Sequence, residues 1–582
     1  MGLTSALNTS LNGLNLNETA IDVLGNNIAN AGTNGFKAST IQFTTQLNRT
    51  LSVGSQPSGD NGGTNPIQIG LGATTAAISK DFSQGAITNS TSPSDLAIQG
   101  EGFFVLDAPG GIVYSRAGNF VLDSQFKLTN ANGARVQGFI ADPDTLQLGN
   151  ELEDIEIRLG QAKAVRETSN VTLNGSLKTS TSATVGTQGS LFLGDSLTDT
   201  ASGDATVDPI TGATALTSVF LDGSGSALFQ DGDVVSFKGL KGGRVIEEQS
   251  FTINMADAAA DGVDDLLNFL EGVLGIATPT DDPSVPNDAS GNAPGVTIGG
   301  DGQIQIVGNI GESNDIDLAM GDLSLTSGGA TSALDLGLDS NSKSQDSDGE
   351  STITNFVTFD SLGDQVNIKL TASLESQDAT SATYRYFVES EDDSRVDTLL
   401  TSGTFTFDGT GTIQSGDSTS VTVLRDASPA DTLQFNIDFS NISGITADTD
   451  PSSLALAAQD GAGPGTLANY VIDESGFING VFDNGIIRTL GQVVLATFSN
   501  PQGLVEAGSG TFAQGVNSGP ASVVAPGSNG AGTLRSGAIE ASNTDIGRNL
   551  VDLIVASTNY RGNARVISSV QELVDELLVL GR

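Results

Sequence analysis

Residues 26–39 read NNIANAGTNGFKAS. The stretch follows a run with helical periodicity, and it places four Asn and two Gly within 14 positions. Asn and Gly tolerate positive φ angles, so they let a chain leave a helix abruptly. The stretch therefore predicts the end of an N-terminal helix, and the residues alone favour an ordinary helix C-cap followed by a loop.

The residues before this stretch form a heptad stripe. Apolar side chains recur at alternating spacings of three and four, and Ser10 and Asn17 occupy the remaining positions of the stripe. The apolar members are Leu3, Leu7, Leu14, Ile21, Leu24 and Ile28.

A second stripe lies near the far end of the chain, in a helix that we expect to begin near Ser542 or Asp545, either of which can cap it. A seven-residue repeat runs through this helix, and Leu550 is one of its companion positions. The repeating members are Ile546, Leu553, Tyr560, Ile567 and Val574. Each helix alone would expose a long apolar stripe and be marginally stable. Either the two helices pair locally, or other copies of the chain cover them, and spacing does not separate these alternatives.

The interior of the chain favours β-structure. Aromatic residues make up only 5% of the chain and Gly is frequent, which is typical of short strands joined by turns. The segment from Tyr114 to Phe139 predicts a meander of hairpins, and Asp360–Gly363 separates two further strands. One internal helix is expected over 262–274. The fold class is therefore mainly β and multidomain, with helices at both ends.

Composition excludes several kinds of chemistry. Lys and Arg total 24 against 69 Asp and Glu, which gives a formal net charge of −45 and disfavours nucleic acid and anionic membranes as partners. The chain contains no Cys, and so no disulfide or thiolate site, and it contains no His. The acidic runs at 281–282 and 346–350 do not fit a twelve-residue calcium loop, so solvated turns are the favoured interpretation. We expect no catalytic residues, no cofactor and no metal.

Targeting signals of the usual kinds are not visible. No Lys or Arg precedes Lys37, which argues against a secretory signal or a transit peptide. No run approaches 18 apolar residues, so no membrane insertion is expected. We expect a chain that is either cytoplasmic or exported by a route that reads another signal.

Several ordered blocks of the sequence resemble flagellar rod and hook proteins. The opening stretch resembles the N-terminal signature of that family, and its linker motif comprises Asn26, Asn27, Asn30, Gly35, Phe36 and Lys37. LAIQGEGFFVL from Leu96, YSRAGNF from Tyr114, ATFSNPQGL from Ala496 and the segment from Ser536 onward resemble later family blocks in the expected order. DSLG at Asp360 is similar to a segment typical of the hook members. The interval 176–345 has no comparable match.

The resemblance implies a particular architecture. The terminal helices would pair as a coiled coil lining a central channel, the β-rich outer domains would be nested insertions, and Phe36 would anchor the linker against a neighbouring subunit. The implied domains are a helical inner-tube domain (1–30 with 541–582), an extended linker (31–75), a β-rich core (76–175 with 476–540), a β-rich insertion with one helix (176–345) and a β-rich outer domain (346–475).

The resemblance also implies a function: a non-enzymatic structural subunit of the flagellar hook, a flexible curved tube that transmits motor torque to the filament. Its implied partners are further copies of itself, the distal rod protein, the hook cap protein, the hook–filament junction protein and the flagellar type III export apparatus. Its implied location is the extracellular hook, reached without a cleaved signal peptide. The alternatives are a rod subunit of the same family, a secreted acidic calcium-dependent adhesin, and a glycan-active enzyme with a carboxylate pair in a cleft.

Overall fold

The computed structural model describes residues 2–59, 62–142, 147–161, 163–187, 189–199, 208–221, 225–255, 261–426, 430, 432–446 and 451–580. The chain divides into two compact units. Met1–Lys163 and Thr466–Arg582 make up the first unit, and Ala164–Gly465 make up the second, which is thus inserted into the first.

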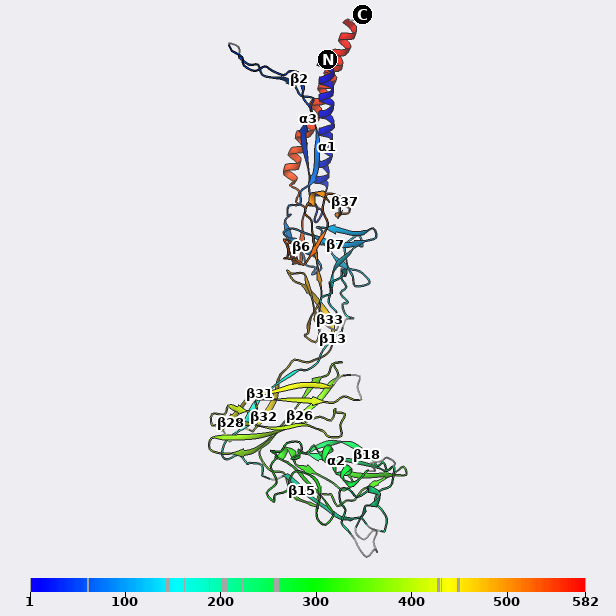
Figure 1. The fold of residues 1–582 in the computed structure, drawn as a ribbon, viewed down its shortest axis with the longest axis vertical. Helices are drawn as coiled ribbons and strands as arrows, with labels where there is room; N and C mark the ends of the chain where they lie inside the picture. Colours follow the sequence, from blue (N-terminus) through cyan, green and yellow to red (C-terminus); the bar gives the residue numbers. More distant parts are fainter. Residues whose placement is uncertain are drawn as a thin grey trace. The chain divides into compact units, whose positions relative to one another are not determined.

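Three α-helices are present in the described ranges, and two of them lie at the chain ends (Figure 1). Helix α1 spans Gly2–Ala29 and α3 spans Ile546–Leu580, and the two run side by side in opposite directions. Asp545 caps α3, because its carboxylate accepts a hydrogen bond from the backbone N–H of Arg548 at 3.1 Å. The expectation of a mainly β chain with contacting terminal helices is confirmed. None of the described helices is both long and apolar enough to cross a membrane.

The side of α1 that is buried consists of small and polar residues. They follow a spacing of three and seven, which keeps them on one face of the helix: Ser10, Asn17, Ala20 and Asn27. On α3 the buried residues are Ala556 and Val570. A Cβ added at Gly13 would lie 2.6 Å from the side chain of Asn563, so the helix backbones approach closely there.

The β-structure of the first unit comes from both ends of the chain. The strands of its N-terminal part are β1 (Ser39–Thr45), β2 (Arg49–Ser52), β3 (Ile67–Ile69), β4 (Ala73–Lys80), β5 (Ile87–Asn89), β6 (Leu96–Gln99), β7 (Phe103–Ala108), β8 (Gly111–Ser115), β9 (Val121–Leu122), β10 (Leu128–Thr129), β11 (Arg135–Ile140) and β12 (Glu153–Asp154). Those of its C-terminal part are β34 (Phe477–Phe482), β35 (Ile487–Val493), β36 (Leu495–Thr497), β37 (Val505–Gly508), β38 (Thr511–Ala513), β39 (Ser522–Val524), β40 (Thr533–Ser536) and β41 (Ala538–Glu540), with a 3₁₀ turn at Pro501–Gly503.

Antiparallel pairing joins these two sets of strands. Strand β5 pairs with β41, β6 with β40, β7 with β36, β8 with β38, and β11 with β35. The core between them is aromatic: Phe103, Tyr114 and Phe512 are buried, and the rings of Phe82 and Phe498 pack against them edge to face. Neither end of the chain can complete this unit without the other.

Two β-rich bodies make up the second unit. The body that contains α2 (Val263–Leu274) has strands β15 (Gly189–Thr198), β16 (Phe220–Leu221), β17 (Val234–Lys241), β18 (Arg244–Thr252), β19 (Gly295–Ile298), β20 (Gln303–Ile310), β21 (Ile316–Asp317), β22 (Leu323–Ser327), β23 (Ala330–Ala333) and β24 (Lys343–Gln345), with 3₁₀ turns at Leu216–Ser218 and Glu312–Asn314. The other body has β14 (Asn170–Lys178), β25 (Ser351–Phe359), β26 (Gln365–Gln377), β27 (Ser381–Glu389), β28 (Leu399–Asp408), β29 (Ile413–Ser415), β30 (Ser418–Val423), β31 (Leu433–Ile445) and β32 (Ser453–Gln459). Strands β13 (Lys163–Arg166) and β33 (Ala462–Ile472) contain the boundaries between the units.

In the body that contains β14 and β25–β32, two sheets enclose one core. The sheet β25–β29 and the sheet β30-β31-β14-β32 both contribute to it. The two strands expected on either side of Asp360–Gly363 are confirmed as β25 and β26, and the structure adds that they pair with each other. The expected internal helix is confirmed as α2, which buries its apolar side in the other body.

We predict that Phe405→Ala destabilises this sandwich by about 3–5 kcal/mol, because the ring is fully buried and the substitution leaves a cavity. The ring lies 5.2–6.1 Å from those of Tyr384, Phe407 and Phe439. Urea unfolding of the full chain, followed by circular dichroism, measures the change. Val245→Ala, at an exposed site in the same unit, is the control and should change stability by less than about 0.5 kcal/mol. An equal effect of both changes would contradict the described core.

Candidate assembly site

The stretch at 26–39 ends α1 and turns the chain back against its own unit. Gly35 has φ = 66°, and a Cβ there would lie 2.4 Å from the backbone nitrogen of Ala117. Only glycine satisfies both constraints, since other residues rarely adopt this φ and their side chains would collide with backbone. The glycine therefore allows the linker to pass directly over the turn that follows β8.

Asn27 fixes the direction in which the linker leaves the helix. Its side chain is buried, accepts a hydrogen bond from the N–H of Ser39 at 2.8 Å and donates one to the Ser39 carbonyl at 2.9 Å. The same amide lies 3.2 Å from the Oδ1 of Asn549 on α3. One side chain therefore holds together the end of α1, the first residue of β1 and the first turn of α3.

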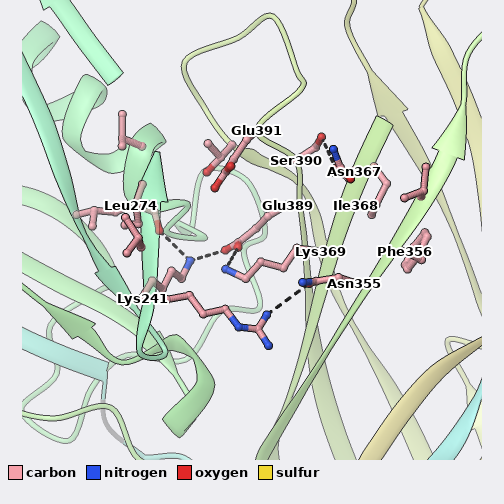
Figure 2. A pocket seen from close by; sticks show the side chains of 16 residues that line it. Lys241, Leu274, Asn355, Phe356, Asn367, Ile368, Lys369, Glu389, Ser390 and Glu391 are labelled. Carbon is pink, nitrogen blue, oxygen red and sulfur yellow. Dashed lines mark hydrogen bonds and ion pairs between the residues drawn. The ribbon is translucent and has the colours of Figure 1, made fainter. Parts of the chain in front are cut away.

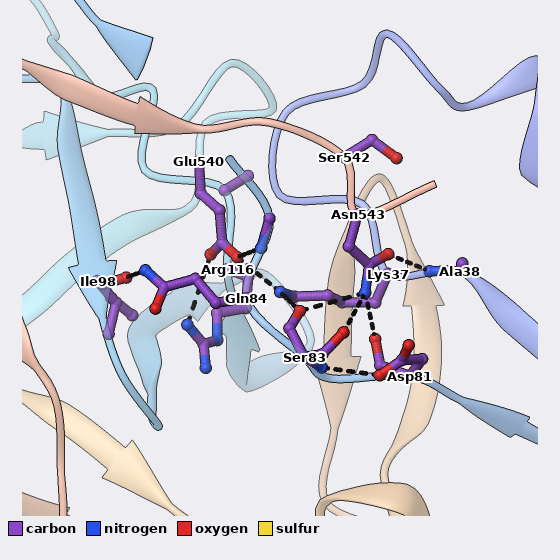
Figure 3. A network of polar contacts seen from close by, with 12 residues as sticks. Lys37, Ala38, Asp81, Ser83, Gln84, Ile98, Arg116, Glu540, Ser542 and Asn543 are labelled. Carbon is purple, nitrogen blue, oxygen red and sulfur yellow. Dashed lines mark hydrogen bonds and ion pairs between the residues drawn. The ribbon is translucent and has the colours of Figure 1, made fainter. Parts of the chain in front are cut away.

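Lys37 and Glu540 form a buried ion pair between residues near the two ends of the chain (Figure 3). Lys37 Nζ lies 2.7 Å from Glu540 Oε1, and both side chains are fully inaccessible to solvent. Lys37 also donates to the carbonyl of Ser83 at 2.7 Å, and Glu540 accepts from the N–H of Gly85 at 2.7 Å. Burial lowers the pKa of Lys37, and the Glu540 carboxylate opposes that shift. The pair therefore depends on both partners.

Two further residues complete this cluster. Arg116 is buried, lies 3.4 Å from the second oxygen of Glu540 and donates to the carbonyl of Gly100 at 2.8 Å. Asn543 accepts a hydrogen bond from the N–H of Ala38 at 2.8 Å and donates to the carbonyl of Asp81 at 2.8 Å. The segment that leads into α3 therefore holds two successive linker residues: Glu540 pairs with Lys37, and Asn543 bonds to the backbone of Ala38.

The residues predicted from the linker motif divide into two groups. Asn27, Gly35, Phe36 and Lys37 are buried, whereas Asn26 and Asn30 lie at the accessible end of α1 and hydrogen-bond to each other at 2.6 Å. Phe36 is only 7% exposed, and Lys80 Nζ lies 4.9 Å from its ring centre. Most of the Phe36 ring is therefore covered within its own chain, and its contact with a neighbouring subunit stays a prediction.

The predicted helix residues are less buried than a closed coiled coil would make them. On α1 the half-buried members of the stripe are Leu7, Leu14, Ile21, Leu24 and Ile28, and Leu3 lies outside the residues whose side chains are described. On α3, Leu553 and Ile567 are half-buried. The other predicted members of that stripe are exposed: Ile546 (49%), Leu550 (45%), Tyr560 (38%) and Val574 (38%).

The sequence offered no signal for Glu540, Asn543 or Arg116 as partners of the linker. Glu540 is the single acidic residue between Arg535 and Asp545, close to the start of α3. An isolated charge beside a helix start is an ordinary feature of a sequence. Its pairing with Lys37 follows from the fold, which brings residues 37 and 540 together.

A cavity of about 400 Å³ in the second unit has charged side chains among its mixed apolar and polar lining (Figure 2). Lys241 donates to the carbonyls of Leu274 and Gly275, at 2.8 and 3.0 Å, and pairs with Glu389. Lys369 lies 2.7 Å from the other oxygen of Glu389. Burial lowers the pKa of Lys241, and Glu389 opposes this. Protein groups satisfy these charges, and the cluster ties the C-terminal end of α2 to β27.

The acidic runs considered for calcium are engaged by basic side chains. Asp282 pairs with Arg385, and Glu350 lies 3.4 Å from Lys178. Across the described part of the chain, no group of three or more metal-ligating side chains is arranged to hold an ion.

We predict that Glu540→Gln destabilises the first unit by about 3–5 kcal/mol, because it leaves the buried cation of Lys37 without its counter-charge. Lys37→Met combined with Glu540→Gln should cost less than the sum of the single changes, and urea unfolding of all three variants measures this coupling. Glu156→Gln, which breaks an exposed pair with Arg158, is the matched control and should change stability by less than about 0.5 kcal/mol. A Glu540→Gln chain as stable as the unchanged one would refute the role given to the pair.

Four family profiles match segments of this chain. Family profiles match in chain order: Flagella basal body rod protein (7–37), Flagellar hook protein FlgE/F/G D1 domain (97–193), Flagellar basal body protein FlaE D2 domain (325–462) and Flagellar basal body rod FlgEFG protein C-terminal (535–580). The first and last of these profiles cover the paired terminal helices.

Relatives align over nearly the whole length. The chain is 27% identical to the flagellar hook protein FlgE of Borreliella burgdorferi over 581 residues, which covers 99% of both chains. It is 24% identical to FlgE of Escherichia coli, covering 99% of this chain and 100% of the relative. Among solved structures, the Helicobacter pylori flagellar hook protein FlgE2 matches 78% of this chain and 100% of its own, at 15% identity and a TM-score of 0.35. With the four profiles in order and relatives aligned from end to end, the chain belongs to the flagellar hook protein family.

Proposed function

We propose that the chain is the structural subunit of a flagellar hook, polymerising into a flexible curved tube that transmits motor torque to the filament. The full-length relatives support a structural hook subunit. In this proposal residues 1–30 and 541–582 form the inner tube, the linker follows at 31–75, and the β-rich parts lie outside it.

The observation that carries the proposal is the apolar surface that the helix pair leaves uncovered. The pairing face uses small and polar residues such as Ser10, Asn17 and Ala556. Large apolar side chains of α3 remain accessible instead: Leu550 (45%), Val551 (60%), Ile554 (66%), Val555 (52%), Val566 (43%), Leu573 (50%) and Leu577 (55%). A monomer rarely exposes a continuous apolar surface of this kind unless another molecule covers it.

A second uncovered surface lies in the linker region. Strands β2 and β3 pair with each other, and all their residues are exposed, including Leu51 (54%) and Ile67 (57%). Leu47 (88%) and Val53 (85%), just outside β2, are exposed as well. An isolated two-stranded hairpin is marginal in water, so packing on a neighbouring subunit would stabilise it. Two different uncovered surfaces on one unit support head-to-tail contacts, which do not close and therefore build an open helical polymer.

The remaining parts of the proposal follow from family membership. Bending would come from the outer domains sliding between alternative contacts while the inner helices hold the tube. The distal rod protein, the hook cap protein and the hook–filament junction protein would be its neighbours. The type III export apparatus would carry it to the extracellular hook without cleavage of a signal peptide. A structural subunit of this kind needs no catalytic step.

A rod subunit of the same family is the second candidate, since the matched profiles include rod proteins. The second unit inserts about 300 residues between the two parts of the first unit. Rod subunits of the family generally lack a large central insertion, so this size favours the hook subunit. Straight tubes from the purified chain would favour the rod subunit, and curved tubes the hook subunit.

We predict that Leu14→Asp or Leu553→Asp blocks polymerisation and leaves both β-rich units folded. Each change places a charge on a half-buried position of the helix pair. Pelleting and electron microscopy measure assembly, and circular dichroism measures folding. Val245→Asp, at a 74% exposed apolar site of the second unit, is the control and should assemble normally. Polymer of normal length from either helix variant would count against the inner-tube role.

A further inference from the structure

The face of α3 that points away from α1 carries its charges in two blocks of opposite sign. Arg561 and Arg565 form the basic block, and Glu572, Asp575 and Glu576 form the acidic block, about two to three turns beyond Arg565. Spacings of three, four and seven residues place all five on one face of the helix. Ala556 and Val570, which are buried, lie on the opposite face. All five charged residues are exposed.

These charges have no counter-charge within the described part of the chain. The ion pairs there include one on α3, between Arg548 and Asp552 at 3.9 Å, and none that involves the five residues of the two blocks. Arg561 is 3.3 Å from the hydroxyl of Ser557 on its own helix. Both blocks are therefore available to another molecule.

We infer that this charged face docks against α3 of a second copy, displaced along the helix axis so that the basic block of one copy faces the acidic block of the next. The inference rests on the proposed polymer and deepens it by assigning a register. Between the centres of the two blocks the helix advances by roughly 16 Å, which is the expected displacement. Copies side by side without displacement would place like charges opposite each other, and this repulsion disfavours that register.

The chemistry suits a register-setting contact. Exposed ion pairs contribute little individually, so the affinity of the polymer comes from the apolar surface beside them. Opposed blocks of charge instead steer approach and penalise wrong alignments. After a single contact, one copy keeps a free acidic block and the other copy keeps a free basic block.

Charge reversal tests the register. The basic-block variant is Arg561→Glu with Arg565→Glu, and the acidic-block variant is Glu572→Lys with Asp575→Lys and Glu576→Lys. Elongation of purified chains from fragments of isolated hooks gives the critical concentration of each. We expect each variant to raise it at least about tenfold, because like charges then meet. The chain with all five changes should return to within about threefold of the unchanged chain. Lys238→Glu with Arg244→Glu, at exposed sites of the second unit, makes the same charge change as the basic-block variant and is its control, which should elongate normally.

Two outcomes would overturn the inference. Normal elongation by both single-block variants would mean that the face lies against solvent or the channel instead of a second copy. Recovery of the basic-block variant by Glu18→Lys with Asp22→Lys on α1, and not by reversal of the acidic block, would assign the contact to α1 of the second copy. Leu553→Asp keeps the two questions apart: if it blocks assembly while the charge variants elongate normally, the hook function stands and the register falls.

Discussion

The buried pair of Lys37 and Glu540 is the interaction on which the rest of the first unit depends. It joins positions 503 residues apart in sequence and lies where the linker from α1 meets the segment that enters α3. A cation buried without a partner would be strongly unfavourable, so each half of the pair requires the other. Strand pairing also joins the two ends of the chain, since β5, β6 and β7 all pair with strands from beyond residue 490.

The constraint explains how the paired terminal helices can leave apolar surface uncovered and still have defined geometry. Asn27 and Asn543 direct the linker, and Gly35 lets it pass close to Ala117. The two helices then meet through small residues. Their large apolar side chains stay accessible. In the proposed polymer other copies would cover them, so the stability of the folded unit and the affinity of the polymer would depend on different residues. A mutation can therefore weaken one and spare the other.

Local patterns predicted the elements well and their contacts poorly. The helix end at 26–39, the internal helix α2 and the hairpin at Asp360–Gly363 all follow from spacing and turn chemistry, which act over a few residues. The heptad pattern correctly identified two helices, but it could not show that Ser10, Ala20 and Ala556 make the close contact while Leu550 faces outward. A hydrophobic stripe indicates a covered surface without saying which molecule covers it. Glu540 and Asn543 were not predicted for a related reason, because pairing across hundreds of residues leaves no local trace.

The most direct test of the central claim is electron microscopy of two purified chains, each seeded with fragments of isolated hooks. One is the full chain, and the other lacks residues 1–30 and 541–582. If the terminal helices build the inner tube, the full chain forms curved tubes and the trimmed chain stays unpolymerised with its β-rich units folded. Tubes of normal diameter from the trimmed chain would contradict the account, because assembly would then reside in the β-rich units.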